Sequence, residues 1–116
     1  MRFLLTFLMD PAALPDADLN SKCFREMMSF VDELKSSGIL LFDSQVLPEP
    51  PVTRLVSVNG RTTETRPTAG FVLGGFFIIE TASYAEALEL ARRCPHSQVG
   101  PVEIRPLNES SENAFP

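Results

Sequence analysis

The sequence is poor in the residues that several specialised protein classes require. Its two cysteines, Cys23 and Cys94, occur in no CxxC or Cys/His spacing, which excludes a disulfide scaffold and argues against a zinc site. The ten lysines and arginines are scattered and the net charge is −5, which disfavours binding to nucleic acid or to an anionic membrane. No apolar run is long enough to cross a bilayer. We therefore expect a cytoplasmic protein with no metal and no cofactor, which binds neither nucleic acid nor membrane.

What is present fits one ordinary globular domain. The chain has 116 residues, of which 44% are apolar and 22% charged. We place the domain at residues 1–107 and expect the polar segment 108–116 to be a flexible tail. The apolar start resembles a signal peptide only in part, because the run over 2–9 is short, Asp10-Pro11 ends it and no small-residue cleavage site follows. A buried strand fits this pattern better.

Apolar periodicity and turn residues predict the order of the elements. The expected elements are a strand over 2–9, a helix from Asp18 or Asn20 to Ser37, a strand over 39–46, a hairpin of 52–58 and 61–65, a strand over 75–80, a helix opened by Ser83 and ended by Pro95, and a strand over 101–105. Asn59-Gly60 marks the hairpin turn. Gly74-Gly75, after an irregular segment over 66–73, indicates either a bulge or a close backbone contact at the start of the strand. The order predicts an α+β fold, a βαββαβ arrangement with an extra β-hairpin, in which an antiparallel sheet carries both helices on one face.

Both expected helices are amphipathic. In the first, apolar residues recur at steps of three and four, and Gly38 follows as the stop. In the second, Ser83 and Glu86 form a capping box. The residues that we expect this helix to turn inward are Tyr84, Ala87, Leu88, Ala91 and Cys94. Both cysteines occupy apolar helical positions, so we expect them to be buried.

The strands over 2–9 and 75–79 carry large apolar side chains on both faces, whereas two helices cover only one. Leaving four such side chains in water would forgo on the order of 6–12 kcal/mol. We therefore expect a homodimer in which a second copy covers the other face by two-fold symmetry. In the alternative, the hairpin or the C-terminal tail folds under the sheet.

Ordered blocks along the whole chain to Leu107 resemble the YCII-related family, specifically its DGPF-domain branch. The blocks are Arg2-Phe3-Leu4-Leu5, Gly38-Ile39-Leu40, Leu73-Gly74-Gly75-Phe76-Phe77-Ile78-Ile79, Tyr84-Ala85-Glu86-Ala87, Cys94-Pro95 and Val102-Glu103-Ile104-Arg105-Pro106-Leu107. The resemblance implies a ferredoxin-like protomer and a dimeric α+β barrel, in agreement with the argument from the two apolar faces.

The same resemblance lends little chemistry. The founding branch carries a His on the first helix and an Asp before the Pro that ends the second, proposed as an acid/base pair; these positions fall at Met27 and Cys94 here. Neither residue relays a proton in the same way, so the pair does not carry over. The Asp-Gly-Pro-Phe signature is replaced by Thr65-Arg66-Pro67-Thr68, which keeps the proline but loses the acid and the aromatic residue.

His96 is the only histidine, the residue type whose charge changes closest to neutral pH. As a general base it needs an orienting carboxylate, for which Glu103 and Asp43 are candidates. A nucleophilic pair of Cys94 and His96 is a further reading, although two positions across a proline rarely give the right geometry. We favour the plainer interpretation, a surface histidine in a loop.

Two arginines are candidates for ligand binding. Arg105 lies on an otherwise apolar strand, where an arginine usually has an anionic partner. That partner is either a ligand or, as we slightly prefer, Glu80 or Glu103 in a structural ion pair. Arg66 lies in the segment before the Gly-Gly strand.

Two hypotheses for function follow. In the first, an apolar cleft between sheet and helices binds a small molecule or hosts a cofactor-free reaction, with Arg66, His96 and Arg105 as polar anchors. In the second, slightly preferred because the family's pair and any cofactor motif are missing, the protein is a non-catalytic accessory or regulatory protein. The sequence does not settle whether the chain is an enzyme. A cleft that holds His96 with a carboxylate in reach favours the first, and a His96 that points to solvent favours the second.

Overall fold

The computed structural model describes residues 1–10, 16–46, 53–65 and 70–108. The elements in chain order are β1 (Arg2–Met9), α1 (Ala17–Ser36), β2 (Leu40–Gln45), β3 (Arg54–Val58), β4 (Arg61–Thr65), β5 (Val72–Glu80), α2 (Tyr84–Arg93), a 3₁₀ turn η1 (Pro95–Gln98) and β6 (Val102–Pro106). The predicted order is confirmed. Of the predicted tail only Asn108 lies within the described residues.

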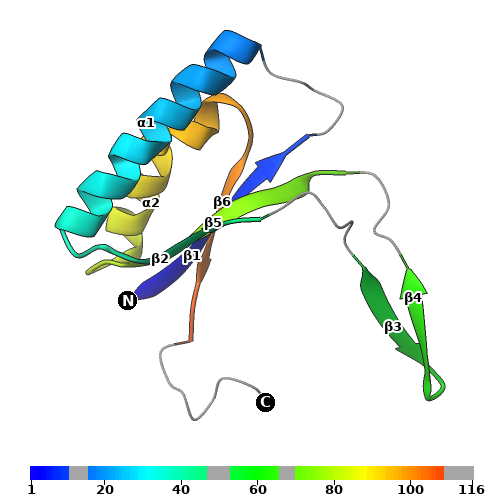
Figure 1. The fold of residues 1–116 in the computed structure, drawn as a ribbon. Coiled ribbons are helices and arrows are strands. Elements are labelled where there is room, and N and C mark those ends of the chain that lie inside the picture. The colour runs from blue at the N-terminus through cyan, green and yellow to red at the C-terminus, as the bar shows by residue number, and fades with distance from the viewer. Residues whose placement is uncertain (11–15, 47–52, 66–69, 109–116) are drawn as a thin grey trace.

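Four of the strands form one antiparallel sheet in the order β2-β5-β1-β6. Strands β3 and β4 form a separate two-stranded hairpin between β2 and β5. Figure 1 shows α1 and α2 side by side on one face of the sheet and the hairpin standing off on the other side. The protomer is therefore a ferredoxin-like α+β fold with an extra hairpin, as predicted.

Helix α1 begins at Ala17, whereas the sequence predicted that Asp18 or Asn20 would cap it. Asp16 occupies the N-cap position and its carbonyl accepts the backbone N–H of Asn20, but its side chain makes no capping bond. The helix ends at Ser36, and Gly38 follows with a φ of +75°, the left-handed conformation expected of the stop. Neither helix of the described residues is long and apolar enough to span a membrane.

Helix α2 begins with the predicted cap. The Ser83 hydroxyl accepts the N–H of Glu86 at 3.2 Å, while the Glu86 carboxylate accepts the N–H of Ala82 rather than that of Ser83. The prediction that Tyr84 points inward is wrong, because 47% of it is exposed. Its ring rests at the edge of the core, 5.9 Å from that of Phe3, and Leu90 fills the interior instead.

Strand β5 starts earlier than predicted, at Val72 instead of Gly75. Two residues of the segment expected to be irregular, Val72 and Leu73, pair with Met9 and Leu8 of β1. The register then shifts between Phe7 and Leu8, where Gly74 is the extra residue on β5. The predicted bulge is therefore present, at the first glycine of the pair.

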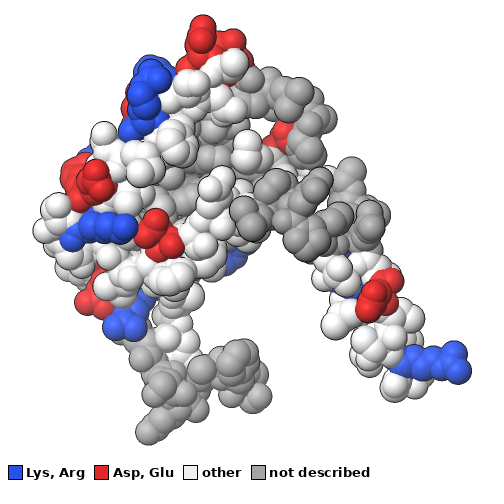
Figure 2. Space-filling view, in the orientation of Figure 1, with Lys and Arg blue, Asp and Glu red and all other residues white. Residues whose placement is uncertain are grey.

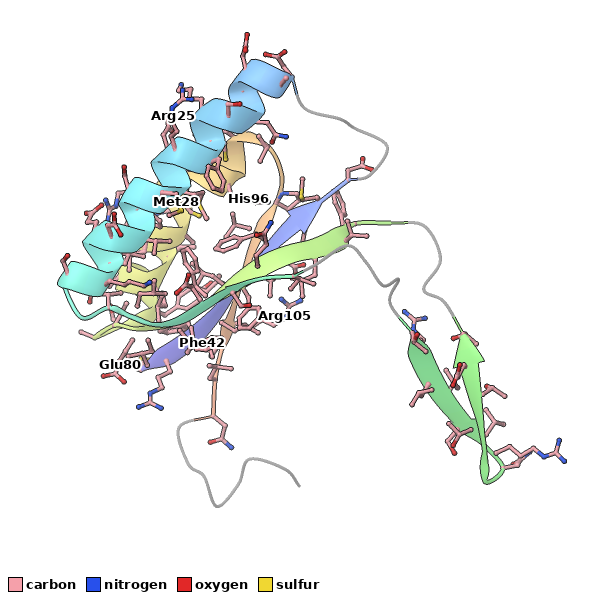
Figure 3. The ribbon with its side chains drawn as sticks, in the orientation of Figure 1. Arg25, Met28, Phe42, Glu80, His96 and Arg105 are labelled. Carbon is pink, nitrogen blue, oxygen red and sulfur yellow. The ribbon has the colours of Figure 1, made fainter. Side chains whose placement is uncertain are left out.

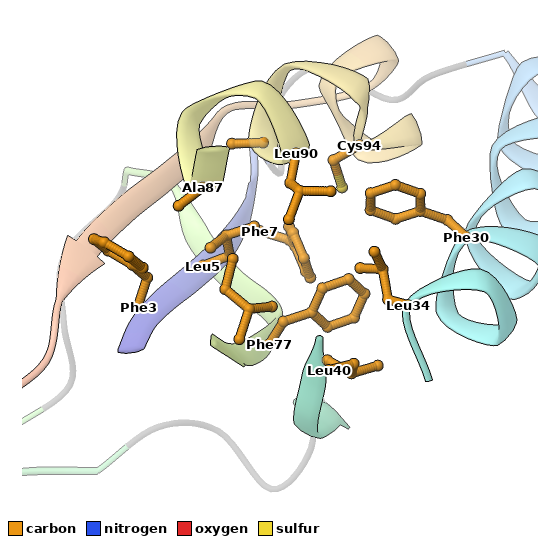
Figure 4. Close-up of a cluster of buried hydrophobic side chains, with 12 residues drawn as sticks. Phe3, Leu5, Phe7, Phe30, Leu34, Leu40, Phe77, Ala87, Leu90 and Cys94 are labelled. Carbon is orange, nitrogen blue, oxygen red and sulfur yellow. The ribbon is translucent and has the colours of Figure 1, made fainter. Parts of the chain in front are cut away.

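The core lies between the sheet and the two helices (Figure 4). Alternate residues of β1 (Phe3, Leu5 and Phe7) point into it and are almost completely buried. From α1, Phe30 and Leu34 close over them, and Phe7 meets Phe77 edge to face at 4.6 Å between ring centroids. Helix α2 and its C-cap residue add four more buried side chains to the cluster: Ala87, Leu90, Ala91 and Cys94.

The opposite face of the sheet, here called the open face, is covered by neither of the helices in the described part of the chain. Its rows follow from the register: Phe42, Ile78, Leu4 and Arg105 in one, and Ser44, Phe76, Thr6 and Glu103 in the next. The rings of Phe42 and Phe76 stack there at 5.9 Å, and 54% of Phe42 is exposed. The hairpin does not fold under this face, so among the described residues the two-faced apolar sheet remains uncovered on one side.

Candidate functional site

A cleft of about 390 Å³ lies between α1 and the helix-facing side of the sheet. Seven of its sixteen lining residues are aromatic or contain sulfur: Phe7, Phe24, Phe77, Met9, Cys23, Met27 and Met28. Five lining residues are polar: Asn20, Asp43, Gln45 and His96, together with Ser44, whose side chain belongs to the open face. This composition, apolar with a few polar groups, is typical of a small-molecule site.

His96 lines the cleft, and the prediction of a surface histidine in a loop is wrong. The residue lies in the η1 turn and is only 8% exposed. Its ring packs 5.4 Å from that of Phe7, and Nε2 donates to the carbonyl oxygen of Leu8 at 2.7 Å. A carbonyl can only accept, so the proton is on Nε2 and, in the neutral ring, Nδ1 is an acceptor.

The Nδ1 atom of His96 makes no hydrogen bond to the described residues. Among the described residues, every buried side-chain nitrogen or oxygen has a hydrogen-bond partner. Since Nε2 makes the ring's hydrogen bond to protein and Nδ1 makes none within this part of the chain, Nδ1 has to be accessible. The ring borders the cleft, so this acceptor can receive a hydroxyl or N–H group of a bound molecule.

The backbone around Gly100 fixes the position of His96. The N–H of Leu8 donates to the carbonyl of Pro101 at 3.0 Å, and the N–H of Gly100 donates to the carbonyl of His96 at 3.0 Å. A Cβ at position 100 would lie 2.1 Å from the Leu8 carbonyl oxygen and 3.0 Å from Nε2 of His96. Glycine is therefore required here for close approach of the two backbones.

Neither candidate carboxylate orients His96. Asp43 lines the same cleft, but it pairs with Lys35 of α1, with 3.6 Å between Oδ1 and Nζ. Glu103 lies on the other face of the sheet, where it accepts from Arg105 at 2.8 Å. The site thus has the buried histidine of the enzyme hypothesis without the carboxylate that the hypothesis requires.

The positions that the family resemblance assigned to an acid/base pair touch each other in the structure. The thiol of Cys94 lies 3.7 Å from the thioether sulfur of Met27. Burial raises the pKa of the Cys94 thiol to about 11, an effect that the backbone N–H of His96 opposes and the nearby Cys23 reinforces. Burial also raises the pKa of Cys23, whose thiol donates to the carbonyl of Pro95 at 3.4 Å. Both thiols are neutral at physiological pH, which disfavours a Cys94–His96 nucleophile.

The raised pKa of Cys94 predicts a loss of stability at alkaline pH. In the unfolded chain the thiol ionises near its ordinary pKa of 9.0, whereas the folded protein keeps it protonated to about 11. The stability from the buried neutral thiol is complete below pH 9 and is lost as the pH rises to 11. Between these pH values we expect the free energy of unfolding to fall by about 2–3 kcal/mol more in the wild type than in Cys94→Ala. Urea titrations monitored by circular dichroism measure both; parallel pH slopes would contradict the burial of a neutral thiol.

The structure separates two of the three predicted polar anchors, His96 and Arg105. His96 lies on the helix side of the sheet and Arg105 on the open face (Figure 3). Arg105 pairs with Glu103, the structural partner that we slightly preferred, and donates to the Thr6 hydroxyl at 3.1 Å. It does not line the cleft. Arg66 lies outside the described residues.

Sequence reasoning missed the mouth of the cleft. Phe24 and Met28 of α1 line it and are 66% and 52% exposed. They are four residues apart, each next to a residue of the stripe that carries Cys23 and Met27. A second apolar stripe beside a buried one is the signal that could have revealed them. Among the described residues, no group of three or more His, Cys, Asp or Glu side chains could hold a metal ion.

The model of the YCII-related domain matches residues 1–111. The chain belongs to the YCII-related family. A search of curated proteins finds no match. Among solved structures, this YCII-related chain is similar to 5-chloro-2-hydroxyhydroquinone dehydrochlorinase (TftG) from Burkholderia phenoliruptrix AC1100, in complex with 2,5-dihydroxybenzoquinone. The TM-score is 0.59 at 14% sequence identity, over 97% of this chain and 99% of the other. At this identity the likeness supports the fold alone.

Proposed function

We propose that this YCII-related protein is a non-catalytic, homodimeric binding domain for a small, neutral and mostly apolar molecule. One observation carries the proposal: the buried His96 lines an apolar cleft with Met27, which stands with the adjacent Cys94 at the positions of the family's acid/base pair. The cleft can therefore hold a ligand and orient one donor group on it. It lacks the paired proton relay that the family's founding branch is thought to use.

The charges of the cleft support a neutral ligand. Within the described residues, Asp43 is the one charged side chain on its wall, and no lysine or arginine lines it. A carboxylate or phosphate group would enter without a cationic partner and would lose its hydration uncompensated. A single-ring aromatic alcohol matches the aromatic and thioether wall, with its hydroxyl directed to Nδ1 of His96.

A simple phenol, which is neutral at pH 7, is a concrete probe for the cleft, and we expect it to raise the melting temperature of the wild type in a saturable way. The 2,5-dihydroxybenzoquinone bound to the structural neighbour is a vinylogous acid and anionic at pH 7, so we expect it to bind this cleft more weakly. His96→Gln keeps an N–H near the position of Nε2 for Leu8 but removes Nδ1, so we expect affinity about 10-fold lower with the fold intact. Arg105→Ala, on the open face, is the matched control and should bind like the wild type.

Two outcomes would contradict the proposal. Failure of every neutral phenol probe to shift the melting temperature of the wild type would remove the binding function. If the wild type converts a probe and His96→Gln does not, the protein is an enzyme, as in the alternative hypothesis of a cofactor-free reaction in the cleft. Mass spectrometry of the probe after incubation separates binding from turnover.

The homodimer is proposed from the open face. Leu4, Phe76 and Ile78 are only partly buried there, and Phe42 is more than half exposed. Monomers rarely leave a contiguous apolar patch of this kind in water, and a second copy covers it by two-fold symmetry. A dimeric α+β barrel of the DGPF-domain branch has this arrangement. Two unpaired, buried cysteines support a cytoplasmic location.

A further inference from the structure

The β3–β4 hairpin is not packed against the other described elements of the chain. All ten residues of its two strands are exposed. Within the described part of the chain, the strands pair with each other and have no extensive contact with the sheet or the helices. An isolated two-stranded hairpin is marginally stable in water at best. A hairpin that projects in this way is therefore expected to have its contacts on another molecule.

The two faces of the hairpin differ in chemistry. Cross-strand pairing places Val56 beside Thr63 and Val58 beside Arg61 on one face, with Arg54 at its far end. This valine face is apolar in the middle and positively charged at both ends. The other face carries Leu55 opposite Glu64 and, nearer the turn, Ser57 opposite Thr62. The valine face is thus suited to an apolar surface with acidic borders.

The position of the hairpin points to a second copy of this chain. In Figure 1 the hairpin stands on the side of the sheet away from α1 and α2, the side of the open face. Figure 2 shows the hollow between the hairpin and the body. A molecule that docks on the open face enters this hollow and comes within reach of the hairpin.

Charge supports the same partner. Two arginines against one glutamate leave residues 54–65 with a net positive charge, whereas the whole chain carries −5. The rest of a second copy is therefore acidic and attracts the positively charged hairpin. In a two-fold symmetric dimer both hairpins would contact the opposite copy, so each contact occurs twice.

We propose that the hairpin is a dimer clasp: the Val56 and Val58 face of each copy packs against the body of the other. The proposal rests on the homodimer of the previous section and adds to it the element that wraps the partner. It gives a reason for an exposed valine pair between arginines, which the fold of a single chain does not need.

The test compares the two hairpin faces in analytical ultracentrifugation. Val56→Thr combined with Val58→Thr keeps β-branched side chains, so the strands retain their propensity while the apolar contact is lost. We expect this double variant to raise the dimer dissociation constant about 10- to 100-fold. Leu55→Thr, on the other face, is the matched control and should change it less than about two-fold. Amide exchange in residues 54–65 should also slow as protein concentration rises.

The outcomes separate the clasp from the dimer. A double variant that dimerises like the wild type, with exchange in the hairpin independent of concentration, overturns the clasp and leaves the dimer standing. If the wild type is a monomer at every concentration up to about 1 mM, which is far above the dissociation constant of any stable dimer, both the clasp and the homodimer are overturned. Equal weakening by the double variant and by Leu55→Thr also overturns the assignment to the valine face.

Discussion

Ile78→Asp is expected to convert the protein from a dimer to a monomer while each protomer stays folded. Ile78 lies at the centre of the open face, opposite Leu4 on one side and Phe42 on the other. In the proposed dimer the substitution buries a carboxylate without a partner, and symmetry introduces it twice. We expect the dissociation constant to rise at least about 100-fold, measured by sedimentation equilibrium.

The control for this variant separates position from charge. Ser29→Asp adds the same charge on the exposed side of α1 and should leave the dimer unchanged. Circular dichroism and thermal melting check that both variants fold. An Ile78→Asp protein that still dimerises as tightly as the wild type would show that the open face is not the interface.

Gly100→Ala is expected to destabilise the protein by about 2–4 kcal/mol. The added Cβ would overlap the carbonyl oxygen of Leu8 at 2.1 Å, and a backbone atom cannot move aside as a side chain can. Separating the two segments also lengthens the bond from His96 to Leu8 and leaves a buried carbonyl poorly paired. Urea unfolding gives the free energy, and ligand affinity should fall with it because His96 loses its support.

Gly74→Ala is the matched glycine control. A Cβ there would meet the thioether sulfur of Met9 at 3.2 Å, the flexible end of a side chain that can turn away. We expect a cost below about 1 kcal/mol. If the two alanine variants were equally stable, the close approach at position 100 would not be what holds His96 in place.

Local chemistry explains why much of the fold could be predicted. Asn59 and Gly60 do adopt positive φ, +52° and +77°, because few other pairs tolerate the hairpin turn. Ser83 does cap α2, since its hydroxyl needs only residues three positions away. The apolar parity of β1 and β5 requires two covered faces whatever the connections between them. Each of these inferences depends on neighbours in sequence.

The candidate site was predicted less well, because it depends on contacts between distant residues. The local sequence around His96 reads as a loop, and nothing near it shows that β1 and Gly100 will close over the ring. Arg105 and His96 were grouped by residue type, but pairing of β6 with β1 puts Arg105 opposite Leu4 on the open face. Register decides on which side of a sheet a side chain lies, and a one-residue shift would have reversed the outcome.

The position of β1 in the sheet has a consequence for synthesis. Of the four strands of the sheet, β1 comes first in the sequence, yet its two neighbours are β5 and β6, which come last. At the usual pace of translation of about 5–20 residues per second, its phenylalanines and leucines wait several seconds for their partners. The sheet closes only when residue 106 has left the ribosome, so until then the apolar side chains of β1 lack the strand partners that later flank them.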